Sequence, residues 1–306
     1  MKKVWVLALL CGLLAAGKIQ AAGEGTVGAD FLKIGLGARA VGMGEAVTAV
    51  VNGVEGMFWN VGGLSKLNKL EATFMRLEYF EDISLNNLAY GQRIGNYGVV
   101  GMFVESLDLG KIERTEIDGS GNLLDQGDSF KASNLVLGLG YSLSLGEKHG
   151  AGVVFKGIQG KIDNETASSF AADLGWTYDF RENLQLGAAV QNIGGEFKYV
   201  SEGDKLPLRV RAGVGYKLIE GLLLGADVVS EVNENKTNGN LGVEYTFKEL
   251  AALRVGYNSE RVNSLGGGAG LSVGAGFKYQ NYNIDYGFVP YGDLGNSHRV
   301  SLGVKF

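Results

Sequence analysis

Apolar and polar residues alternate with a period of two from about residue 70 to the end of the chain. In residues 135–145 every odd position is Leu or Tyr, and the even positions from 138 on are Gly or Ser. In residues 209–218 the even positions are apolar, and the odd positions are Arg, Gly or Lys. Successive side chains of a β-strand point to opposite faces. Strands with an apolar face towards lipid and a small or polar face towards the lumen are typical of membrane barrels.

The alternation divides into fourteen predicted strands, an even number, as a closed antiparallel bacterial barrel requires. Tight turns, such as 95–96 and 280–281, alternate with longer or more polar links, of which 109–127 is the longest. Tight turns on one side and longer loops on the other match periplasm and cell exterior, so we expect both termini on the periplasmic side. The predicted strands are 70–79, 83–94, 97–108, 128–146, 150–162, 167–180, 184–199, 206–218, 222–232, 238–247, 251–259, 269–279, 282–290 and 298–306.

Residues 29–67 differ from everything after them, because they are rich in Ala, Gly and Met and place apolar residues at helical spacings. This pattern predicts two or three short helices. A barrel of fourteen strands leaves an interior wide enough to need a plug if it is not to leak. We therefore expect a helical plug over residues 23–68 and the transmembrane barrel over 69–306.

The N-terminus has the pattern of a secretory signal peptide, with two lysines, an apolar run to about residue 14, and small residues before a cut near residue 22. Cys11 lies within this run and is preceded by Leu10 where a lipoprotein signal requires a small residue. At the other end, the final strand closes on Phe306, as outer-membrane barrels usually do. These two features place the mature protein, residues 23–306, in a bacterial outer membrane, with Phe306 as the assembly signal for the barrel-assembly machinery.

Composition narrows the classes further. The 50 glycines among 306 residues are about twice the globular average. Without a triplet repeat they suit inward barrel positions, where a missing side chain leaves room in the lumen. Cys11 is the only cysteine, so the mature chain offers neither a disulfide framework nor a thiolate site. Removal of residues 1–22 lowers the formal net charge from −5 to −8, which argues against a nucleic-acid partner.

Five motifs carry a resemblance to a known family: GARAVGMGEA (37–46), FWNVGGL (58–64), VQNIGG (190–195), LPLRVRAGVGY (206–216) and the block 285–306. Together they resemble the PorV/PorQ-like outer-membrane proteins, a branch of the FadL-type barrels. The resemblance implies fourteen strands, a helical hatch in the lumen, and a shuttle role in type IX secretion. The pair Val61 and Gly62 departs from the Pro-Ala that usually follows the asparagine in this family.

Enzyme chemistry finds little support in the sequence. The glycines of GLGARA (35–40) match a dinucleotide fingerprint, but no strand precedes them. His149 and His298 fall on opposite sides of the predicted membrane and cannot share a metal. Ser297 and His298 are adjacent on a strand, so they point to opposite faces and cannot form a nucleophile–base pair. We therefore expect no enzyme, no cofactor and no metal site.

Two groups of residues are candidates for function. An apolar path through the hatch would favour transport, although the same side chains could simply pack the plug; its members are Phe31, Met43, Met57, Phe58, Trp59 and Asn60. Charged residues on the luminal parity could guide a ligand, clamp the hatch or pair with one another; they are Arg209, Arg211, Glu244, Arg254, Asp285 and Arg299.

Three functions remain open at this point. The first is a binding or shuttle component for secreted proteins, with cargo or translocon proteins as partners. The second is a FadL-like passive channel for a hydrophobic small molecule. The third is a structural scaffold in contact with outer-membrane lipid.

Overall fold

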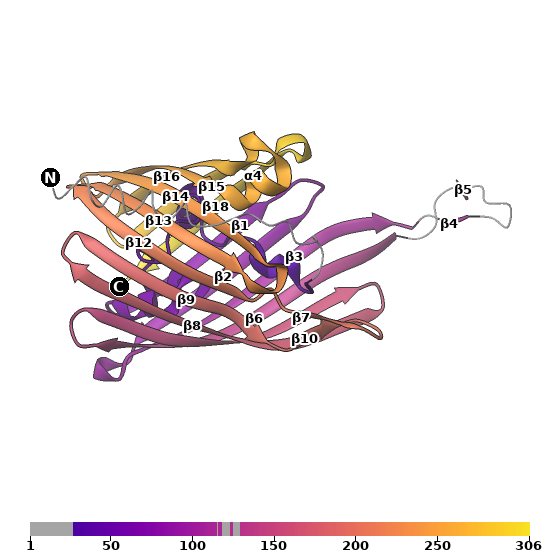
Figure 1. Cartoon of the computed structure of the whole chain (residues 1–306), viewed down its shortest axis with the longest axis horizontal. Coiled ribbons are helices and arrows are strands. Elements are labelled where there is room, and N and C mark those ends of the chain that lie inside the picture. Colours follow the sequence, from indigo (N-terminus) through magenta and orange to yellow (C-terminus); the bar gives the residue numbers. More distant parts are fainter. Residues whose placement is uncertain (1–26, 115, 118–122, 125–128) are drawn as a thin grey trace.

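The computed structural model describes residues 27–114, 116–117, 123–124 and 129–306. The predicted signal peptide lies outside the described residues. Fourteen antiparallel strands close into one barrel, which confirms the predicted fold class (Figure 1). The barrel strands are β1 (Leu70–Glu78), β2 (Ser84–Arg93), β3 (Val99–Glu113), β6 (Ser129–Leu145), β7 (His149–Ile162), β8 (Glu165–Arg181), β9 (Leu184–Gly194), β12 (Arg209–Ile219), β13 (Leu222–Glu231), β14 (Lys236–Phe247), β15 (Ala251–Asn258), β16 (Leu271–Tyr279), β17 (Tyr282–Pro290) and β18 (Asn296–Lys305).

The barrel closes between its first and last strands. Strands β1 and β18 pair over eight residues, from Glu71 opposite Lys305 to Glu78 opposite His298. The Phe306 amide then donates to the Leu70 carbonyl at 2.9 Å. Because closure leaves no strand edge unpaired in the lipid, the backbone hydrogen bonds of the wall are satisfied internally.

The structure departs from the predicted pattern mainly in three places. The segment 184–199 is not one strand, because Asn192 adopts a left-handed φ of 61° and the β8–β9 register shifts beside it. Strand β9 ends at Gly194, and β10 (Glu196–Lys198) forms a separate hairpin with β11 (Gly203–Lys205). The link 260–268 holds the short helix α4 (Ser259–Leu265), which the Asn258 side chain caps. Strand β3 continues five residues beyond its predicted end and pairs with β6 as a ribbon that projects past the rim (Figure 1).

The first described residues lie at the opposite end of the barrel from Phe306. The Gly28 amide donates to the Lys205 carbonyl in the β10–β11 hairpin at 2.9 Å, at the end that carries the longer links. Phe306 lies at the end that carries the tight turns. The expectation that both ends of the mature chain lie on one side is therefore wrong for the start of the described chain, because this segment crosses the lumen before the first strand begins.

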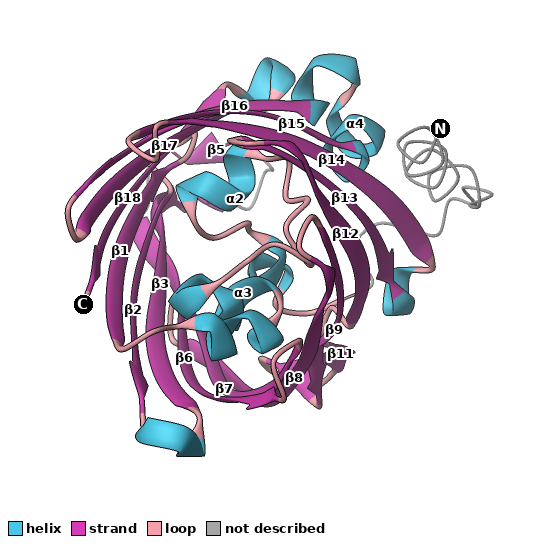
Figure 2. Cartoon of the chain, turned by 90° about the vertical axis from the view of Figure 1, so that its left-hand side faces the viewer, coloured by secondary structure: helices cyan, strands magenta, loops and turns pink. Residues whose placement is uncertain are grey.

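Five short helices form a plug inside the ring of strands (Figure 2). They are η1 (Asp30–Lys33), α2 (Ala38–Gly42), η2 (Gly53–Glu55), α3 (Gly56–Trp59) and η3 (Val61–Lys66), three of them 3₁₀ helices. Within the described part of the chain, no helix is long and apolar enough to cross a membrane. The plug supplies apolar residues to all three buried clusters in the lumen, including Leu36, Met43 and Met57.

The two faces of the strands differ as the alternation requires. Leu137, Leu139 and Phe155 point outwards and are 55–64% exposed, whereas luminal Arg211 and Arg299 are 1% exposed. Aromatic side chains gather near strand ends, where His149 stacks on Tyr178 with ring centroids 4.3 Å apart. The outward face therefore suits lipid, and the luminal face is buried by the plug.

Candidate functional site

Luminal glycines bring the wall against the plug around almost the whole circumference. On twelve of the fourteen barrel strands, a Cβ added to one luminal glycine would come within 4 Å of a plug atom. Only glycine lets the plug backbone approach this closely, as at Gly256, where a Cβ would overlap the Gly44 amide. These glycines are Gly91, Gly101, Gly140, Gly150, Gly175, Gly187, Gly213, Gly225, Gly242, Gly256, Gly274 and Gly287.

Hydrogen bonds complete the circle on the remaining two strands. On β1, the Glu71 carboxylate accepts the Val54 amide at 3.1 Å. On β18, the Ser301 hydroxyl accepts the Ala38 amide at 2.9 Å. The plug therefore contacts every strand of the barrel.

A charged network joins plug helix α2 to the wall. Arg39 donates to both carboxylate oxygens of Glu244, at 2.9 and 2.8 Å. Glu244 also accepts Arg254 from the neighbouring strand at 2.6 Å, and Arg254 donates to Asp285 at 2.6 Å. Burial disfavours the charged form of Arg39, but the Glu244 carboxylate outweighs it and holds the pKa of the guanidinium above its ordinary value. The network has equal numbers of positive and negative groups, so it acts as a clamp and leaves no charge over for a ligand.

A second network holds the plug segment before η2. The Asp227 carboxylate accepts the amides of Val47 and Thr48 and the Thr48 hydroxyl, the last at 2.5 Å. Arg211 pairs with Asp227 at 3.2 Å and donates to the Glu45 carbonyl at 2.8 Å. The same guanidinium lies 4.8 Å from the centre of the Trp59 ring, within reach of a cation–π contact.

The two remaining luminal arginines serve different parts of the chain. Arg209 donates to Glu231 at 2.7 Å and to Glu260 of α4 at 2.5 Å, so it ties α4 to the rim. Arg299 donates to the Gly35 carbonyl of the plug at 3.3 Å. All six candidate luminal residues are thus buried, and five of them belong to the plug clamps.

The candidate hatch residues separate into two places. Phe58 packs edge-on against Phe103 with centroids 5.1 Å apart, and Phe31 packs against Phe197 at 6.3 Å. Met57 fills the space left by Gly101 and Gly140. Met43 is fully buried in another cluster, on the β12–β15 side. The structure therefore brings together Phe31, Met57 and Phe58 but leaves Met43 apart.

Asn60 pins the backbone of the plug. Its amide group donates to the carbonyls of Thr48 at 2.7 Å and Trp176 at 2.9 Å, and its oxygen accepts the Gly62 amide at 3.1 Å. With every polar atom of the side chain engaged, Asn60 positions the chain and leaves no free group for a ligand.

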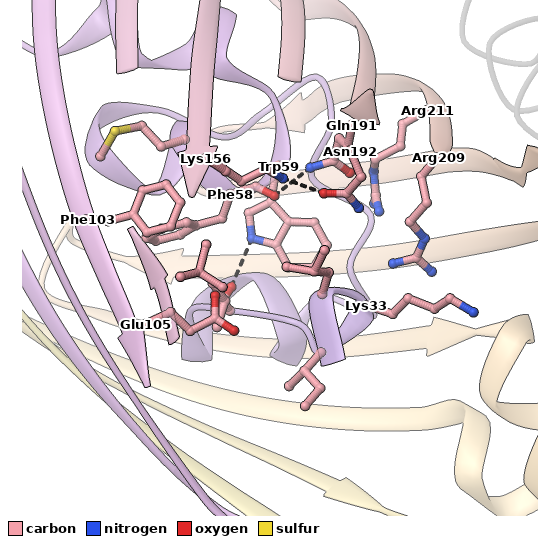
Figure 3. A pocket seen from close by; sticks show the side chains of 15 residues that line it. Lys33, Phe58, Trp59, Phe103, Glu105, Lys156, Gln191, Asn192, Arg209 and Arg211 are labelled. Carbon is pink, nitrogen blue, oxygen red and sulfur yellow. Dashed lines mark hydrogen bonds between the residues drawn. The ribbon is translucent and has the colours of Figure 1, made fainter. Parts of the chain in front are cut away.

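A small cavity is lined by Phe58 and Trp59 of α3 and by the plug residues Lys33 and Leu36 (Figure 3). Its volume is about 40 Å³, enough for a few waters and too small for a drug-sized ligand. Trp59 donates to the Leu36 carbonyl at 2.9 Å, and Gln191 donates to the Phe58 carbonyl at 2.7 Å. Glu105 lines the cavity with one buried carboxylate oxygen that has no hydrogen-bond partner in the described part of the chain.

A larger cavity of about 670 Å³ lies at the tight-turn end, between the plug and the wall. Plug residues Arg39 and Glu55 line it, and burial raises the pKa of the Glu55 carboxyl to about 7. Among the described residues, no group of three His, Cys, Asp or Glu side chains could hold a metal ion.

Sequence reasoning missed several residues that hold the plug, including Lys33, Thr48, Glu71 and Asp227. Asp227 and Glu71 lie on the luminal parity of their strands, which could have identified them as buried acids. Lys33 bonds to Glu234 beyond β13, a contact that only the closed barrel reveals.

Solved barrels of the FadL type share this fold. The Pseudomonas putida toluene transporter TodX matches with a TM-score of 0.63 and 12% identity, over 88% of this chain and 96% of that chain. The Ralstonia pickettii toluene transporter TbuX matches with a TM-score of 0.60 and 13% identity, over 89% and 98%. A Pseudomonas aeruginosa FadL homologue matches with a TM-score of 0.53 and 12% identity, over 88% and 98%. At these identities the likeness concerns the fold alone.

No curated protein sequence matches this chain. A family model described as Type IX secretion system protein PorV matches residues 19–222, which is more than half of the sequence. The match covers the plug and the wall from β1 to β12, where most of the luminal glycines and both partners of the Arg211–Trp59 contact lie. The chain therefore belongs to the PorV family of outer-membrane β-barrels.

Proposed function

We propose that this protein is a docking component of a type IX secretion system, which holds secreted proteins at the extracellular rim of the barrel. The family match motivates the proposal, and the observation that carries it is the plug in contact with all fourteen strands. A barrel whose lumen is filled in this way serves better as a rigid membrane anchor than as an open channel.

The clamps oppose release of the plug. A route past it on the β12–β17 side would break two buried networks, one around Asp227 and one around Glu244. Removing one partner of a buried ion pair costs about 3–5 kcal/mol, because the other charge stays buried without compensation. Spontaneous opening on this side is therefore rare.

The proposed docking surface is built from three features at the rim that carries the longer links. The β3–β6 ribbon projects furthest, up to Glu113 opposite Ser129. The β10–β11 hairpin and helix α4 lie at the same end, and Val200 beside the hairpin is 74% exposed. Extended links on a rigid barrel suit partner recognition, since loops on a rigid scaffold commonly carry binding residues.

A passive channel for a hydrophobic small molecule is the second candidate. Besides the fold shared with the toluene transporters, one feature favours it: the luminal wall of β3, β6 and β7 carries the buried apolar side chains of Phe103, Val136 and Ile158, beside Glu105 and Lys156. Plug residues Ala29, Phe31 and Leu32 pack against this apolar wall. Displacement of the segment 29–32 would expose these apolar side chains to the lumen.

A reversible lock on the plug separates the two candidates. Val50 of the plug lies opposite Gly215 of β12, and a Cβ added to Gly215 would stand 3.6 Å from the Val50 Cβ, which suits a disulfide. The only cysteine of the sequence is Cys11, within the predicted signal peptide. The pair Val50→Cys and Gly215→Cys should therefore form one defined crosslink, with each single variant as its control.

The docking proposal predicts that the oxidised double variant captures secreted proteins as well as the wild type does. Capture is measured by affinity purification in detergent, followed by native mass spectrometry of co-purifying proteins and lipids. Loss of protein capture on oxidation, or a lone barrel that carries a stoichiometric lipophile, would overturn it. Deletion of 111–125 should leave the barrel folded and weaken capture, because it removes the tip of the projecting ribbon.

A further inference from the structure

The cavity at the tight-turn end opens on the side opposite to the proposed docking rim. Its volume of about 670 Å³ lies within the roughly 300–1,000 Å³ of ordinary ligand pockets. Its walls come from the periplasmic ends of β1 and β14–β18, and its inner end is the plug. Side-chain amides line it, namely Asn52, Asn68, Gln280, Asn281 and Asn283. Amides offer both donors and acceptors, which a polypeptide backbone requires of a binding site.

Charge is distributed unevenly along this cavity. At the inner end, Arg39 and Arg254 are engaged by Glu244 and Asp285 in the plug clamp. Glu55 lies beside them, and no side-chain hydrogen bond or ion pair joins it to the described residues. The inner end therefore has one carboxylate more than it has cations.

The mouth of the cavity is basic. Lys66 pairs with Asp179, and Lys305 pairs with Glu71. Lys69, Lys278 and Glu249 also line the cavity and are exposed, without an ion pair among the described residues, so the mouth keeps a net positive charge. An occupant that complements both regions has a positive tip and negative charge behind the tip.

We propose that this cavity binds a polypeptide segment from the periplasmic side, with a basic residue at its tip that meets Glu55 and acidic residues behind it that meet Lys69 and Lys278. A free polyamine matches the inner end but would be repelled at the mouth. Apolar side chains such as Leu67, Leu250 and Phe277 also line the cavity, but the inner end, where the tail of a fatty acid would lie, holds the charged groups of Arg39, Arg254 and Glu55. The inference goes beyond the proposed docking of secreted proteins, because it concerns the other end of the barrel.

The probe is a fluorescein-labelled hexapeptide, acetyl-RGGGEE, added to the full-length purified protein and followed by fluorescence anisotropy. The wild type should bind it, and Glu55→Gln should weaken binding about tenfold, because a charge-assisted hydrogen bond is lost. Glu182→Gln, in the β8–β9 turn at the same end but outside the cavity, is the matched control and should bind as the wild type does. Lys278→Glu should also weaken binding, through the acidic half of the peptide.

Ionisation adds an independent readout. The charged groups around Glu55 are Arg39 of α2, Asp285 of β17, Glu71 of β1 and Lys305 of β18. Binding by the wild type should strengthen from pH 6 to pH 8, as the Glu55 carboxyl loses its proton, and Glu55→Gln should not share this dependence. Equal binding of acetyl-QGGGEE, which lacks the basic residue at the tip, or no effect of either substitution, would overturn the proposal. Displacement of the probe by an equal concentration of spermidine would assign the site to polyamines instead.

Discussion

Arg39 on plug helix α2 and Glu244 on strand β14 form a bidentate ion pair, with Nε to Oε2 at 2.9 Å and Nη2 to Oε1 at 2.8 Å. The two residues are separated by 205 positions in the chain. Both side chains are at least four-fifths buried, and Arg254 provides the second cation that the carboxylate needs. The pair thus joins the plug to the wall at the inner end of the larger cavity.

Substitution of Arg39 by Ala should release the plug more than a comparable change at the surface. The substitution leaves the buried Glu244 carboxylate with one cation in place of two. We therefore expect the free energy that holds the plug in the lumen to fall by about 3 kcal/mol. Hydrogen exchange of residues 29–67 in detergent measures the effect. Lys66→Ala breaks a half-exposed pair with Asp179 and is the control, expected to cost at most about 1 kcal/mol. Equal exchange in both variants would contradict the clamp.

The luminal glycines should tolerate no side chain where the plug backbone touches them. Gly256→Ala places a methyl group on the Gly44 amide, so we expect the plug to be displaced or the folded yield to fall. Gly267→Ala is the matched control, because nothing lies within 4 Å of its added Cβ. Folded yield is read from the mobility difference between heated and unheated samples on a gel. A normal yield and protected plug in Gly256→Ala would argue against close packing.

The C-terminal residue should matter for assembly more than for the final structure. Phe306 is 60% exposed, so its ring contributes little to packing within the barrel. We expect Phe306→Ser to reduce the amount of folded barrel in the outer membrane while leaving the melting temperature of the purified barrel close to that of the wild type. Tyr279→Ser, at an aromatic residue of the same exposure at the end of β16, serves as the control. Unchanged membrane levels of Phe306→Ser would remove the residue as an assembly signal.

The docking of the plug should weaken as pH rises through neutrality. Burial, followed by the negative charges of Asp285 and Glu71, raises the pKa of Glu55 from 4.5 to about 7 in the docked plug, against the opposing effect of Arg39 and Lys305. Between these values the docked form holds a proton that the released form has lost, so increasing pH favours release. Hydrogen exchange around η2, corrected for intrinsic rates, should increase from pH 5 to pH 8 in the wild type and change less in Glu55→Gln. A pH response of the same size in both would refute the assignment.

The strands of the barrel wall could be predicted from the sequence because the facing of each side chain depends on the local alternation of apolar and polar residues. Whether Leu139 faces lipid and Gly140 faces the lumen depends only on the alternation within one strand, and all fourteen strands were identified in this way. The errors occur where the backbone leaves the alternation. Within the predicted strand 184–199, the β8–β9 register shifts at the left-handed Asn192 and β9 ends two residues later at Gly194, and no periodicity reports such a change.

Only some residues of the candidate site could be predicted from the sequence. Arg211 and Glu244 stood out as charges on the luminal parity, but nothing in the sequence near them indicates Thr48 or Arg39 as their partners. Those contacts join residues 163 and 205 positions apart, and they arise from where the plug lies when the barrel has closed. Asn60 was expected on a ligand path. Its side chain donates to two backbone carbonyls, Thr48 in the plug and Trp176 in the barrel wall.

The sequence by itself determined that the wall is a β-barrel, how many strands it has, and which residues face outwards and inwards. Alternation with a period of two follows from the geometry of a single strand. It also determined which positions lack a side chain in the lumen. Only the tertiary structure decided what fills the space at those glycines, which acids clamp the plug, and that the start of the described chain lies opposite Phe306. These features depend on how the plug segment passes through the closed barrel. No local pattern in the sequence specifies which residue of each strand contacts the plug.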